Sequence, residues 1–516
     1  MHALAELLPL ERFYEKSRES FEDIVRYADS EEAACMSHSE LERELEKRGR
    51  ELMRRIMQEH LDRRSPGEAK GPVKDRDGEE RTRKRLHERA LETVLGTVEV
   101  ERAGYGREGE DSLHPLDGEL NLPPERYSLE LRRRVAEEAA KNSFEETLES
   151  VEKATGGHVP KRQVEELVQR AARDFDAFYE ARRPEAALMD HSVLVITVDG
   201  KGVVMRQEDL REQTRKAAAK RKRKMKARLC KGEKTNAKRM ATVASVYTVS
   251  PRVRAPEDIV GKDGNHRTPP CARAAQKRVW AKLDKPPEAV IEEAFDEALA
   301  RDPAKELTWV ALVDGNRTQI KALRRLARKK EVDLTIVVDV VHVIEYLWKA
   351  GRVFHPEPGP ELEGWVSHRL LEILRGKAGY VAGGMRRSAT LRGLSEKVRT
   401  PVDDCARYLL NHTPYLRYDQ CLARGFPIAT GVIEGACRHL VKDRMEVTGA
   451  RWSLKGAEAV LRLRALRSSH DFDEYWAFHE AREYERNHQA LYEDGIVPST
   501  VKPHLKRRRP RLKSVK

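Results

Sequence analysis

Hydrophobic residues along the first 190 positions of the chain recur mainly at helical spacing. This pattern predicts helices before residue 64 and three short helices farther on, over 128–141, 143–154 and 160–172. Between them, residues 92–103 alternate apolar and polar side chains around Gly96, which predicts a β-hairpin. Three short helices joined by brief turns fit a helix-turn-helix DNA-binding region, and they fit an ordinary helical bundle equally well.

The pattern changes at residue 193, where nearly continuous apolar runs predict buried strands. The predicted strands are two within 193–206, about a tight glycine turn, and one each over 241–250, 307–315 and 333–341, with helices over 271–300, 317–330 and 342–351. Three β segments followed by a β-α-β-α sequence predict an α/β core built around a mixed five-stranded sheet.

Residues after 351 return to helical spacing, with one helix expected at 431–447 and a helical tail at 454–490. The predicted fold class is therefore a multidomain, helix-rich α+β protein. The expected regions are a helical N-terminus (1–90), a hairpin plus helix-turn-helix-like DNA-binding region (91–190), the first part of the α/β core (191–351), a helical insertion (352–430), a helix followed by C-terminal helices (431–490) and a basic tail (491–516).

Composition excludes several classes of protein. The 516 residues correspond to about three domains, and no run approaches 18 uninterrupted apolar residues, so no membrane span is predicted. The N-terminus has neither the basic start nor the apolar core of a secretory signal. Six scattered cysteines without a Cys-x-x-Cys pair argue against a disulfide scaffold or a four-cysteine zinc site, and they fit a reducing cytoplasm.

The net charge of +13 is concentrated in two segments. Residues 211–239 carry 14 Lys and Arg against two Glu, and residues 501–516 carry eight and no acid. Two basic segments on an otherwise acidic chain favour binding to nucleic acid over a merely solvated surface, and the lack of interleaved aromatics favours phosphate contacts over base stacking. The candidate contacts are Lys220, Arg221, Lys222, Arg223 and Lys224 in the first segment and Arg507, Arg508 and Arg509 in the second.

Two predicted strands end in the same phrase, Val-Asp-Gly, which places Asp199 and Asp314 at strand ends. Ligands of open α/β sheets bind at strand ends, and neighbouring strands lie about 4.8 Å apart. If the strands that carry Asp199 and Asp314 are neighbours, both carboxylates can reach one hard divalent cation such as Mg²⁺. A single aspartate at a strand end is more often a turn or capping residue, so the predicted cation site depends on Asp199 and Asp314 being present as a pair.

A third acid, Glu434, lies in the first turn of the helix predicted at 431–447. Arg438 and Lys442 follow it at helical spacing on one polar stripe. The stripe is either a ladder of surface ion pairs or a metal-binding carboxylate with two cations beside it that hold a phosphodiester.

Asp339 and His342 lie where the strand predicted at 333–341 meets the next helix. Asp339 is an alternative to Asp314 as the second acid. Asp314 is preferred because its strand is expected to lie beside the strand of Asp199. His342 is expected to be an orienting group, a proton shuttle or a packed histidine.

Taken together, these strands, acids and helices resemble the DDE transposases with an RNase H-like core, and more narrowly the ISKra family of bacterial insertion-sequence transposases, which are relatives of the Mutator-like group. The resemblance covers about residues 90–480. The resembling stretches are 115–146, 156–180, 195–206 (VITVDGKGVVMR), 309–319 (WVALVDGNRTQ), 339–354 and 430–453 (TGVIEGACRHLVKDRMEVTGARWS).

The resemblance implies that Asp199, Asp314 and Glu434 are the catalytic, metal-binding acids. It also implies that Asp339 and His342 match the D-x-x-H signature of Mutator-like enzymes. Arg451 and Trp452 match the Arg-Trp pair that follows the glutamate helix, and the resemblance implies that they contact DNA. One departure is visible: some DDE transposases place a Lys or Arg seven residues after the Glu, where this chain has Val441, with Lys442 one position later. Arg438 and Lys442 are therefore equal candidates for the cation that positions DNA.

The activity that the resemblance implies is cleavage and joining of DNA at the terminal inverted repeats of a mobile element. The expected chemistry is phosphoryl transfer with two Mg²⁺ ions, for which Mn²⁺ can substitute. The expected partners are double-stranded DNA, as terminal repeats and as target, and further copies of the chain in a homodimer or larger homo-oligomer. The expected location is the bacterial cytoplasm, in association with the nucleoid. The alternatives are an RNase H-like structure-specific nuclease and a non-catalytic DNA-binding regulator derived from a transposase.

Overall fold

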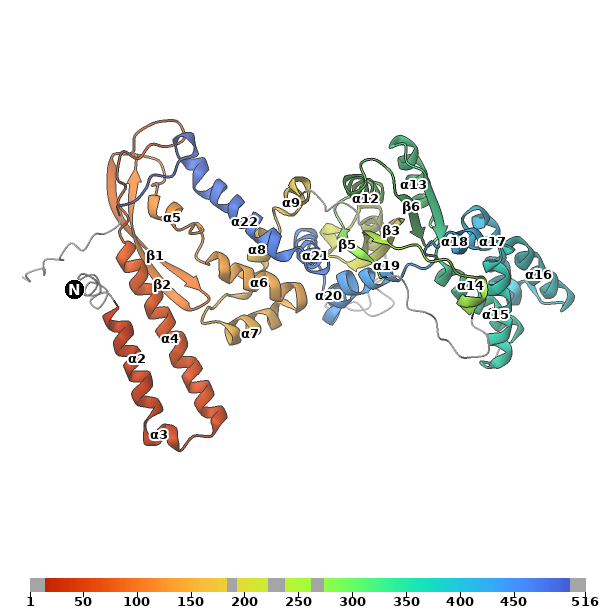
Figure 1. The fold of residues 1–516 in the computed structure, drawn as a ribbon, viewed down its shortest axis with the longest axis horizontal. Helices are drawn as coiled ribbons and strands as arrows, with labels where there is room; N and C mark the ends of the chain where they lie inside the picture. Colours follow the sequence, from red (N-terminus) through yellow and green to blue (C-terminus); the bar gives the residue numbers. More distant parts are fainter. Residues whose placement is uncertain (1–13, 183–192, 221–236, 261–272, 356, 502–516) are drawn as a thin grey trace, which may run out of the picture. The chain divides into compact units, whose positions relative to one another are not determined.

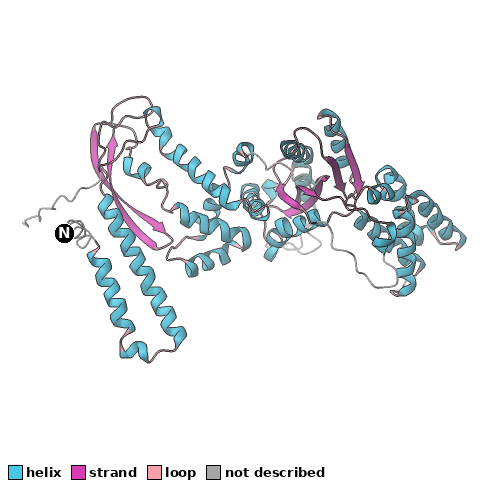
Figure 2. Ribbon diagram, viewed as in Figure 1, coloured by secondary structure: helices cyan, strands magenta, loops and turns pink. Residues whose placement is uncertain are grey.

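A computed structural model describes residues 14–182, 193–220, 237–260, 273–355 and 357–501. The chain divides into two compact units, each described by itself. Unit 1 comprises the residues up to Phe178 together with those from Asp473 onward, and unit 2 comprises Tyr179–Phe472. Figure 2 shows that helices predominate and that strands gather in two places, a hairpin in unit 1 and a sheet in unit 2. Among the described residues, no helix has the length and apolar character needed to cross a bilayer.

Unit 1 combines a helical hairpin, a β-hairpin and a group of short helices (Figure 1). Its elements are α2 (Glu15–Ala28), α3 (Glu31–Ala34), α4 (His38–Arg64), β1 (Arg83–Thr93), β2 (Gly96–Gly106), α5 (Pro115–Glu119), α6 (Leu129–Lys141), α7 (Phe144–Ala154), α8 (Lys161–Ala171), α9 (Phe175–Ala181) and, after unit 2, α22 (Phe472–Asn487). Both α9 and α22 extend across the boundary with unit 2 by a few residues.

The three predicted helices of unit 1 are confirmed as α6, α7 and α8, and serine side chains cap the first two. Ser128 accepts a hydrogen bond from the backbone N–H of Leu131, and Ser143 forms a capping box with Glu146. The predicted hairpin at Gly96 is confirmed but is longer, because β1 begins at Arg83. The first residues of β1 are exposed and polar, so no alternation marked them as strand.

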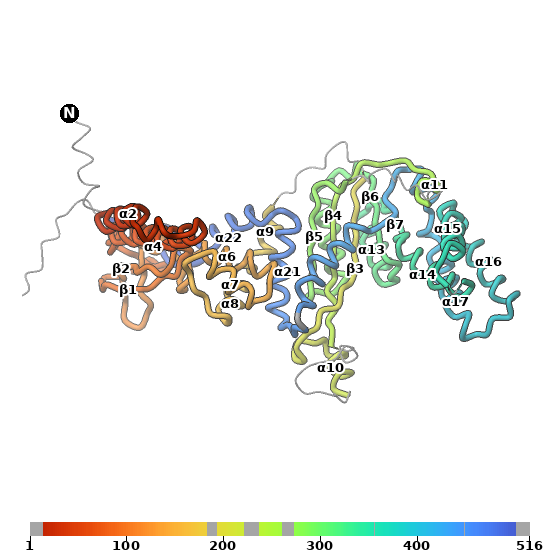
Figure 3. The backbone as a smooth tube through the Cα atoms, turned by 90° about the horizontal axis from the view of Figure 1, so that it is seen from below, coloured from red at the N-terminus to blue at the C-terminus, as the bar shows by residue number. Residues whose placement is uncertain are grey.

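Unit 2 contains a five-stranded mixed sheet in the order β5-β4-β3-β6-β7 (Figure 3). The strands are β3 (Val193–Val204), β4 (Lys238–Val249), β5 (Ala275–Lys282), β6 (Thr308–Val313) and β7 (Leu334–Val338). The central strand β3 is antiparallel to β4 and parallel to β6, which in turn is parallel to β7. The predicted mixed α/β core with five strands is thus confirmed.

The helices of unit 2 connect these strands and follow them. They are α10 (Glu212–Ala219), α11 (Pro256–Val260), α12 (Pro287–Arg301), α13 (Arg317–Lys329), α14 (Val340–Phe354), α15 (Pro360–Leu374), α16 (Ala378–Leu391), α17 (Glu396–His412), α18 (Tyr418–Ala423), α19 (Gly431–Ala436), α20 (Asp443–Met445) and α21 (Leu454–Ser468). The predicted helical insertion corresponds to α15–α18, of which α15 and α17 pack against α14.

Two predictions about the sheet are wrong, although the number of strands is right. Residues 193–206 form one long strand instead of two, because Gly200 and Gly202 stay paired with Thr242 and Met240 of β4. The predicted helix over 271–300 is β5 followed by α12, separated at Pro286 and Pro287. Only the second half of β5 is buried, so its polar first half gave no strand signal.

Two predicted helices are also divided. The helix expected at 431–447 contains a π-helical turn, Cys437–Lys442, between α19 and α20. The tail expected at 454–490 consists of α21 and α22, which are separated at His470, where φ is +63°. A left-handed residue cannot continue an α-helix, so the direction of the chain changes there.

Candidate metal centre

Three neighbouring parallel strands each present an aspartate at the same level of the sheet. Val198 of β3 lies opposite Val313 of β6, and Val313 lies opposite Val338 of β7. The next residues along these strands are Asp199, Asp314 and Asp339. The prediction that the strands of Asp199 and Asp314 are neighbours is therefore confirmed, and Asp339 is added to the same row.

Asp339 is buried and fixed by local hydrogen bonds. It caps α14, because its Oδ1 accepts a hydrogen bond of 2.8 Å from the backbone N–H of Val341. Its own N–H donates to the carbonyl of Val313 over 2.8 Å, which ties the end of β7 to β6. The hydroxyl of Thr430, just before α19, donates to its other carboxylate oxygen. These bonds leave the carboxylate with unused lone pairs, since an ionised carboxylate has about four acceptor positions.

Glu434 and His342 complete a group of possible metal ligands with Asp339. One side-chain atom from each of the three lies within 4.8 Å of the other two. Ligands about 2.1 Å from one divalent ion are about 3–4 Å apart, so small side-chain adjustments suffice for all three to bind a common ion. Asp339 comes from the end of β7, His342 from the first turn of α14 and Glu434 from α19.

The charges around Glu434 favour a cation. Partial burial raises the pKa of Glu434, and the carboxylates of Asp339, Glu345 and Asp199 raise it further. His342 acts in the opposite direction. Acids that repel one another in this way are stabilised when a divalent ion enters between them.

Asp199 lies beside this group and is held by two hydrogen bonds. Its Oδ1 accepts from the backbone N–H of Gly200 over 2.6 Å, and its Oδ2 accepts from the thiol of Cys437 over 3.2 Å. Burial, and then the charge of Asp199, raise the pKa of the Cys437 thiol, which keeps it a hydrogen-bond donor. Nothing in the sequence marked Cys437 as part of the site, because it lies on the apolar side of the predicted helix.

Asp314 is half-buried in the turn between β6 and α13. Its Oδ1 accepts from the backbone N–H of Asn316 over 2.8 Å, and its carbonyl accepts from the hydroxyl of Tyr408 over 2.9 Å. The predicted triad Asp199, Asp314 and Glu434 does not form a group whose ligand atoms all lie within 4.8 Å, in the part of the chain that the structure describes. The acid that the structure places next to Glu434 is Asp339.

Helices of the insertion support the two acid-bearing turns. Tyr418 donates to the carbonyl of Val338 over 2.6 Å. The ring of Tyr408 stacks on that of Tyr346 in α14, with centroids 4.2 Å apart. The Nε2 of His412 lies 2.8 Å from the carbonyl oxygen of Gly315, whose φ of +92° favours glycine. The sequence carried no signal for these contacts, because the partners are about 60–100 residues apart.

The π-helical turn bears on the choice between Arg438 and Lys442. A π turn holds one more residue than an α turn, so it shifts the later residues around the helix by about one position. Val441 is buried, whereas Arg438 and Lys442 are exposed. Around the helix axis, Lys442 therefore has about the same angular position relative to Glu434 that residue 441 would have in a regular α-helix.

The remaining predicted contacts with DNA have different outcomes. Trp452 is only 5% exposed, its backbone pairs with Met205, and its indole N–H donates to the carbonyl of Met445. Its ring is therefore packed inside the protein in this structure, and its expected contact with DNA stays a prediction. Arg451 is exposed, as is Lys220 after α10. Predicted contacts outside the described residues are Arg221, Lys222, Arg223, Lys224, Arg507, Arg508 and Arg509.

A second group with metal-ligand chemistry lies in unit 1, where Asp174, His479 and Glu483 come within 4.8 Å of one another. His479 is bound to Asp174 over 2.7 Å through its Nδ1. Arg132 donates to Glu483 over 2.7 Å, and its side chain is fully buried. Arg486 donates to Asp174 over 2.5 Å. Guanidinium groups therefore already neutralise both carboxylates.

No model of a known protein family matches this chain, and no curated protein matches it. The features that can indicate a function for this chain are therefore the two groups of acids and histidines themselves. Both have ligands that could hold a metal ion, and only the group in unit 2 has carboxylates that no arginine neutralises in the described residues.

Proposed function

We propose that unit 2 is the RNase H-like catalytic core of a DNA transposase of the DDE type. The observation that carries this proposal is the group Asp339, His342 and Glu434, with Asp199 near Glu434 and with Asp199, Asp314 and Asp339 at the ends of three successive parallel strands. Acids that lie far apart in the sequence, and that no arginine neutralises, are typical of a site that binds divalent ions for phosphoryl transfer.

The sheet supports the same proposal. Its first three strands are antiparallel neighbours in chain order, and the fourth and fifth add in parallel on the other side of the first. This order is compatible with an RNase H-like core. A long helical insertion then separates Asp339 from Glu434, as the resemblance to DDE transposases implies.

We assign the ligands in two sets that share Asp199. Asp199 and Asp314 would hold one ion, and Asp199 and Glu434 would hold the other, with Asp339 and His342 beside Glu434. When bound there, divalent ions would supply the charge that activates the attacking oxygen and stabilises the leaving oxygen. Oxygen ligands suit Mg²⁺, and the imidazole of His342 makes Mn²⁺ an effective substitute.

The chain's other residues position the DNA. The Cys437 thiol and the Gly200 N–H orient the two oxygens of Asp199. Arg438 and Lys442, exposed on the helix of Glu434, attract the phosphodiester toward the acids. The basic segments add phosphate contacts, each of which contributes about −0.9 to the slope of log affinity against log salt concentration.

The test is cleavage and joining of DNA by the purified chain in Mg²⁺ or Mn²⁺. The substrate is a duplex that carries the sequences flanking the gene. Asp199→Asn, Asp314→Asn and Glu434→Gln each remove one ligand charge while keeping the side-chain shape. We expect each to lower strand cleavage about 10³-fold, because about 4 kcal/mol of transition-state stabilisation is lost. The matched control is Asp333→Asn, an exposed aspartate just before β7.

The products distinguish the proposal from its alternatives. Joined strands support a transposase, and cleavage without joining supports a structure-specific nuclease that uses the same acids. DNA binding without any metal-dependent cleavage in the wild-type chain supports a regulator. Cleavage by Asp199→Asn at the wild-type rate would remove Asp199 from the site.

A further inference from the structure

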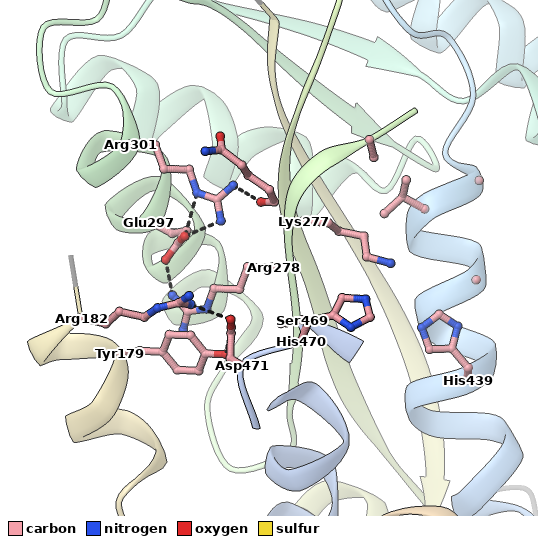
Figure 4. Close-up of a pocket in the computed structure, with 15 residues that line it drawn as sticks. Tyr179, Arg182, Lys277, Arg278, Glu297, Arg301, His439, Ser469, His470 and Asp471 are labelled. Atoms are coloured by element: carbon pink, nitrogen blue, oxygen red, sulfur yellow. Dashed lines mark hydrogen bonds and ion pairs between the residues drawn. The ribbon is translucent and has the colours of Figure 1, made fainter. Parts of the chain in front are cut away.

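A cavity of about 530 Å³ lies in unit 2 beside α19 (Figure 4). It is lined by parts of β5, α12, α19 and the turn after α21. Gly431, Val432 and Gly435 of α19 line the cavity, whereas Glu434 of the same helix belongs to the acid group. The cavity and the acid group are therefore lined by neighbouring residues of the same short helix.

The two acids in the cavity wall are already neutralised. Glu297 binds Arg278 and Arg301. The carboxylate of Asp471 binds Arg182 over 2.9 Å and accepts a hydrogen bond from the hydroxyl of Tyr179 over 2.8 Å. Figure 4 shows these pairs gathered on one side of the cavity.

The other side of the cavity carries basic groups without acidic partners. Lys277, His439 and His470 lie there (Figure 4). No ion pair or side-chain hydrogen bond joins these three side chains to any residue in the described part of the chain. Burial lowers the pKa of His439, the positive charges of Lys277 and Arg464 lower it further, and Asp443 acts in the opposite direction.

We propose that this cavity binds a phosphate group of a nucleotide in the DNA strand that enters the acid site. Its wall carries four Lys and Arg side chains against two acids, so it retains an excess of positive charge even when both histidines are neutral. Ammonium and guanidinium groups are the usual protein ligands of phosphate, and the volume suits one nucleotide. The choice of DNA as the source of the phosphate rests on the proposed function.

Gly431 and Gly435 make this cavity accessible. A Cβ on Gly431 would meet no atom within 4 Å, and one on Gly435 would touch only the His439 ring. Glycine in a helix is about 1 kcal/mol less favourable than alanine, so these two glycines, one turn apart, destabilise α19. Because they lack side chains, they leave the space of the cavity beside α19 unfilled.

The experiment measures binding of a fluorescent DNA duplex over a range of salt concentrations, in a chelator, so that no cleavage occurs. Lys277→Gln is compared with Lys321→Gln, an exposed lysine of α13. We expect Lys277→Gln alone to reduce the salt slope by about 0.9, the value for one phosphate contact. Equal slopes for the two variants would overturn the proposal.

Two further arms identify the ligand. Gly431→Leu adds a side chain where a Cβ meets no atom within 4 Å, and it is expected to weaken DNA binding as Lys277→Gln does; unchanged binding would count against the cavity. Inorganic phosphate is expected to displace DNA from Lys321→Gln more readily than from Lys277→Gln. If the slope depends on Lys277 while the wild-type chain shows no metal-dependent cleavage, the phosphate site stands and the proposed function fails.

A second surface, in unit 1, carries an independent inference. Helices α2 and α4 form an antiparallel hairpin (Figures 1 and 3). Ser17 of α2 binds Glu59 of α4, and Arg48 of α4 stacks on Tyr27 of α2. These contacts set the register, in which Phe21 lies level with Arg55.

An apolar patch lies on one flank of this hairpin. Phe21 is 57% exposed and Met53 is 55% exposed. Phe21 follows the buried contact position Ser20 by one residue, and Met53 follows Leu52 by one residue. In a pair of antiparallel right-handed helices, the residue that follows a residue facing the other helix lies on the same flank of the pair, whichever helix it belongs to. The patch consists of Phe21, Val25, Met53, Ile56 and Met57.

We infer that the patch binds the same patch of a second copy of this chain. Exposed Glu42 and Glu46 lie toward the α3 end of this flank, and exposed Arg18 and His60 lie toward the other end. A two-fold axis through the patch places the acidic end of one hairpin against the basic end of the other, which is the self-complementarity of a symmetric interface. Gly49 faces open space at mid-helix, where it would let a partner helix approach closely.

The test is the molar mass of the full chain in solution, measured by light scattering. We expect a dimer for the wild type and a monomer for Met53→Glu and Phe21→Glu, with circular dichroism unchanged. The control is Leu391→Glu, an exposed leucine at the end of α16, which should remain dimeric. A monomeric wild type, or dimers of both patch variants, would overturn the inference.

Discussion

Units 1 and 2 each contain a histidine between two carboxylates, but different charges neutralise the two groups. In unit 1, Arg132 and Arg486 bind the acids next to His479 directly. In unit 2, the acids around His342 have a hydroxyl, backbone N–H groups and other acids as neighbours. Residue types alone therefore do not identify a metal site. A metal site also requires that the protein does not already neutralise the carboxylates with its own cations.

The largest expected effect on stability is in unit 1. Glu483→Gln removes one of the two acids that bind the buried Arg132, together with an acidic partner of Arg173 and Arg486, and should lower the free energy of unfolding by about 3–5 kcal/mol. Hydrogen exchange in peptides of α6 and α22 measures the change. The control, Glu485→Gln, removes an exposed partner of Arg482 and should change exchange little. Equal exchange in the two variants would show that the buried network contributes nothing specific.

The next largest effect should come from metal binding by unit 2. Mn²⁺ at 100 times its dissociation constant should stabilise the wild-type fold by about 2.7 kcal/mol, seen as a higher melting temperature. Glu434→Gln should lose most of this stabilisation, whereas Asp333→Asn should keep it. A metal response that survives Glu434→Gln would place the ion elsewhere, for example at the group in unit 1.

A smaller effect should follow from Tyr418→Phe. The variant removes the hydroxyl that binds the carbonyl of Val338 and leaves that buried carbonyl without its donor. We expect a loss of about 1 kcal/mol in unfolding free energy, together with weaker Mn²⁺ binding because Asp339 is less firmly placed. Tyr380→Phe, an exposed tyrosine of α16, is the control. Unchanged metal affinity would mean that the insertion does not help to position the acid.

The smallest effect should be the pH dependence of stability in a chelator. The pKa of Glu434 is raised in the folded protein, so the unfolded chain releases this proton at lower pH than the folded chain does. The contribution of Glu434 to stability is therefore lost as pH rises from its unfolded pKa through its folded pKa. Above that window, Glu434→Gln should be slightly more stable than the wild type without metal. Parallel pH profiles for the two proteins would contradict the repulsion.

Some of this arrangement could be predicted from sequence. The two Val-Asp-Gly phrases marked strand ends, and the chain order of the strands placed Asp199 next to Asp314. The strand β5 was not predicted, because its polar residues Gln276, Lys277 and Arg278 interrupt the apolar pattern of a buried strand. The burial of Trp452 was not predicted, because the Arg-Trp motif carries no information about whether its residues are exposed.

The environment of the acids could not be predicted, for a physical reason. The bonds from Thr430 and Cys437 to Asp339 and Asp199 join residues about 90 and 240 apart, and only the packed fold brings them together. The nearness of Asp339 to Glu434 likewise depends on where α19 packs. Local patterns specify elements, whereas these contacts depend on tertiary packing.

The hydrogen bonds from Tyr408 and Tyr418 to the ends of β6 and β7 have a consequence for how this protein can change. Helices α15–α18 are inserted between Asp339 and Glu434, yet they cannot be trimmed to a short loop without loosening both acid-bearing turns. Deletions in this region should therefore displace both acid-bearing turns even where the sheet still folds, and insertions should be tolerated only at the outer ends of these helices, away from the two tyrosines.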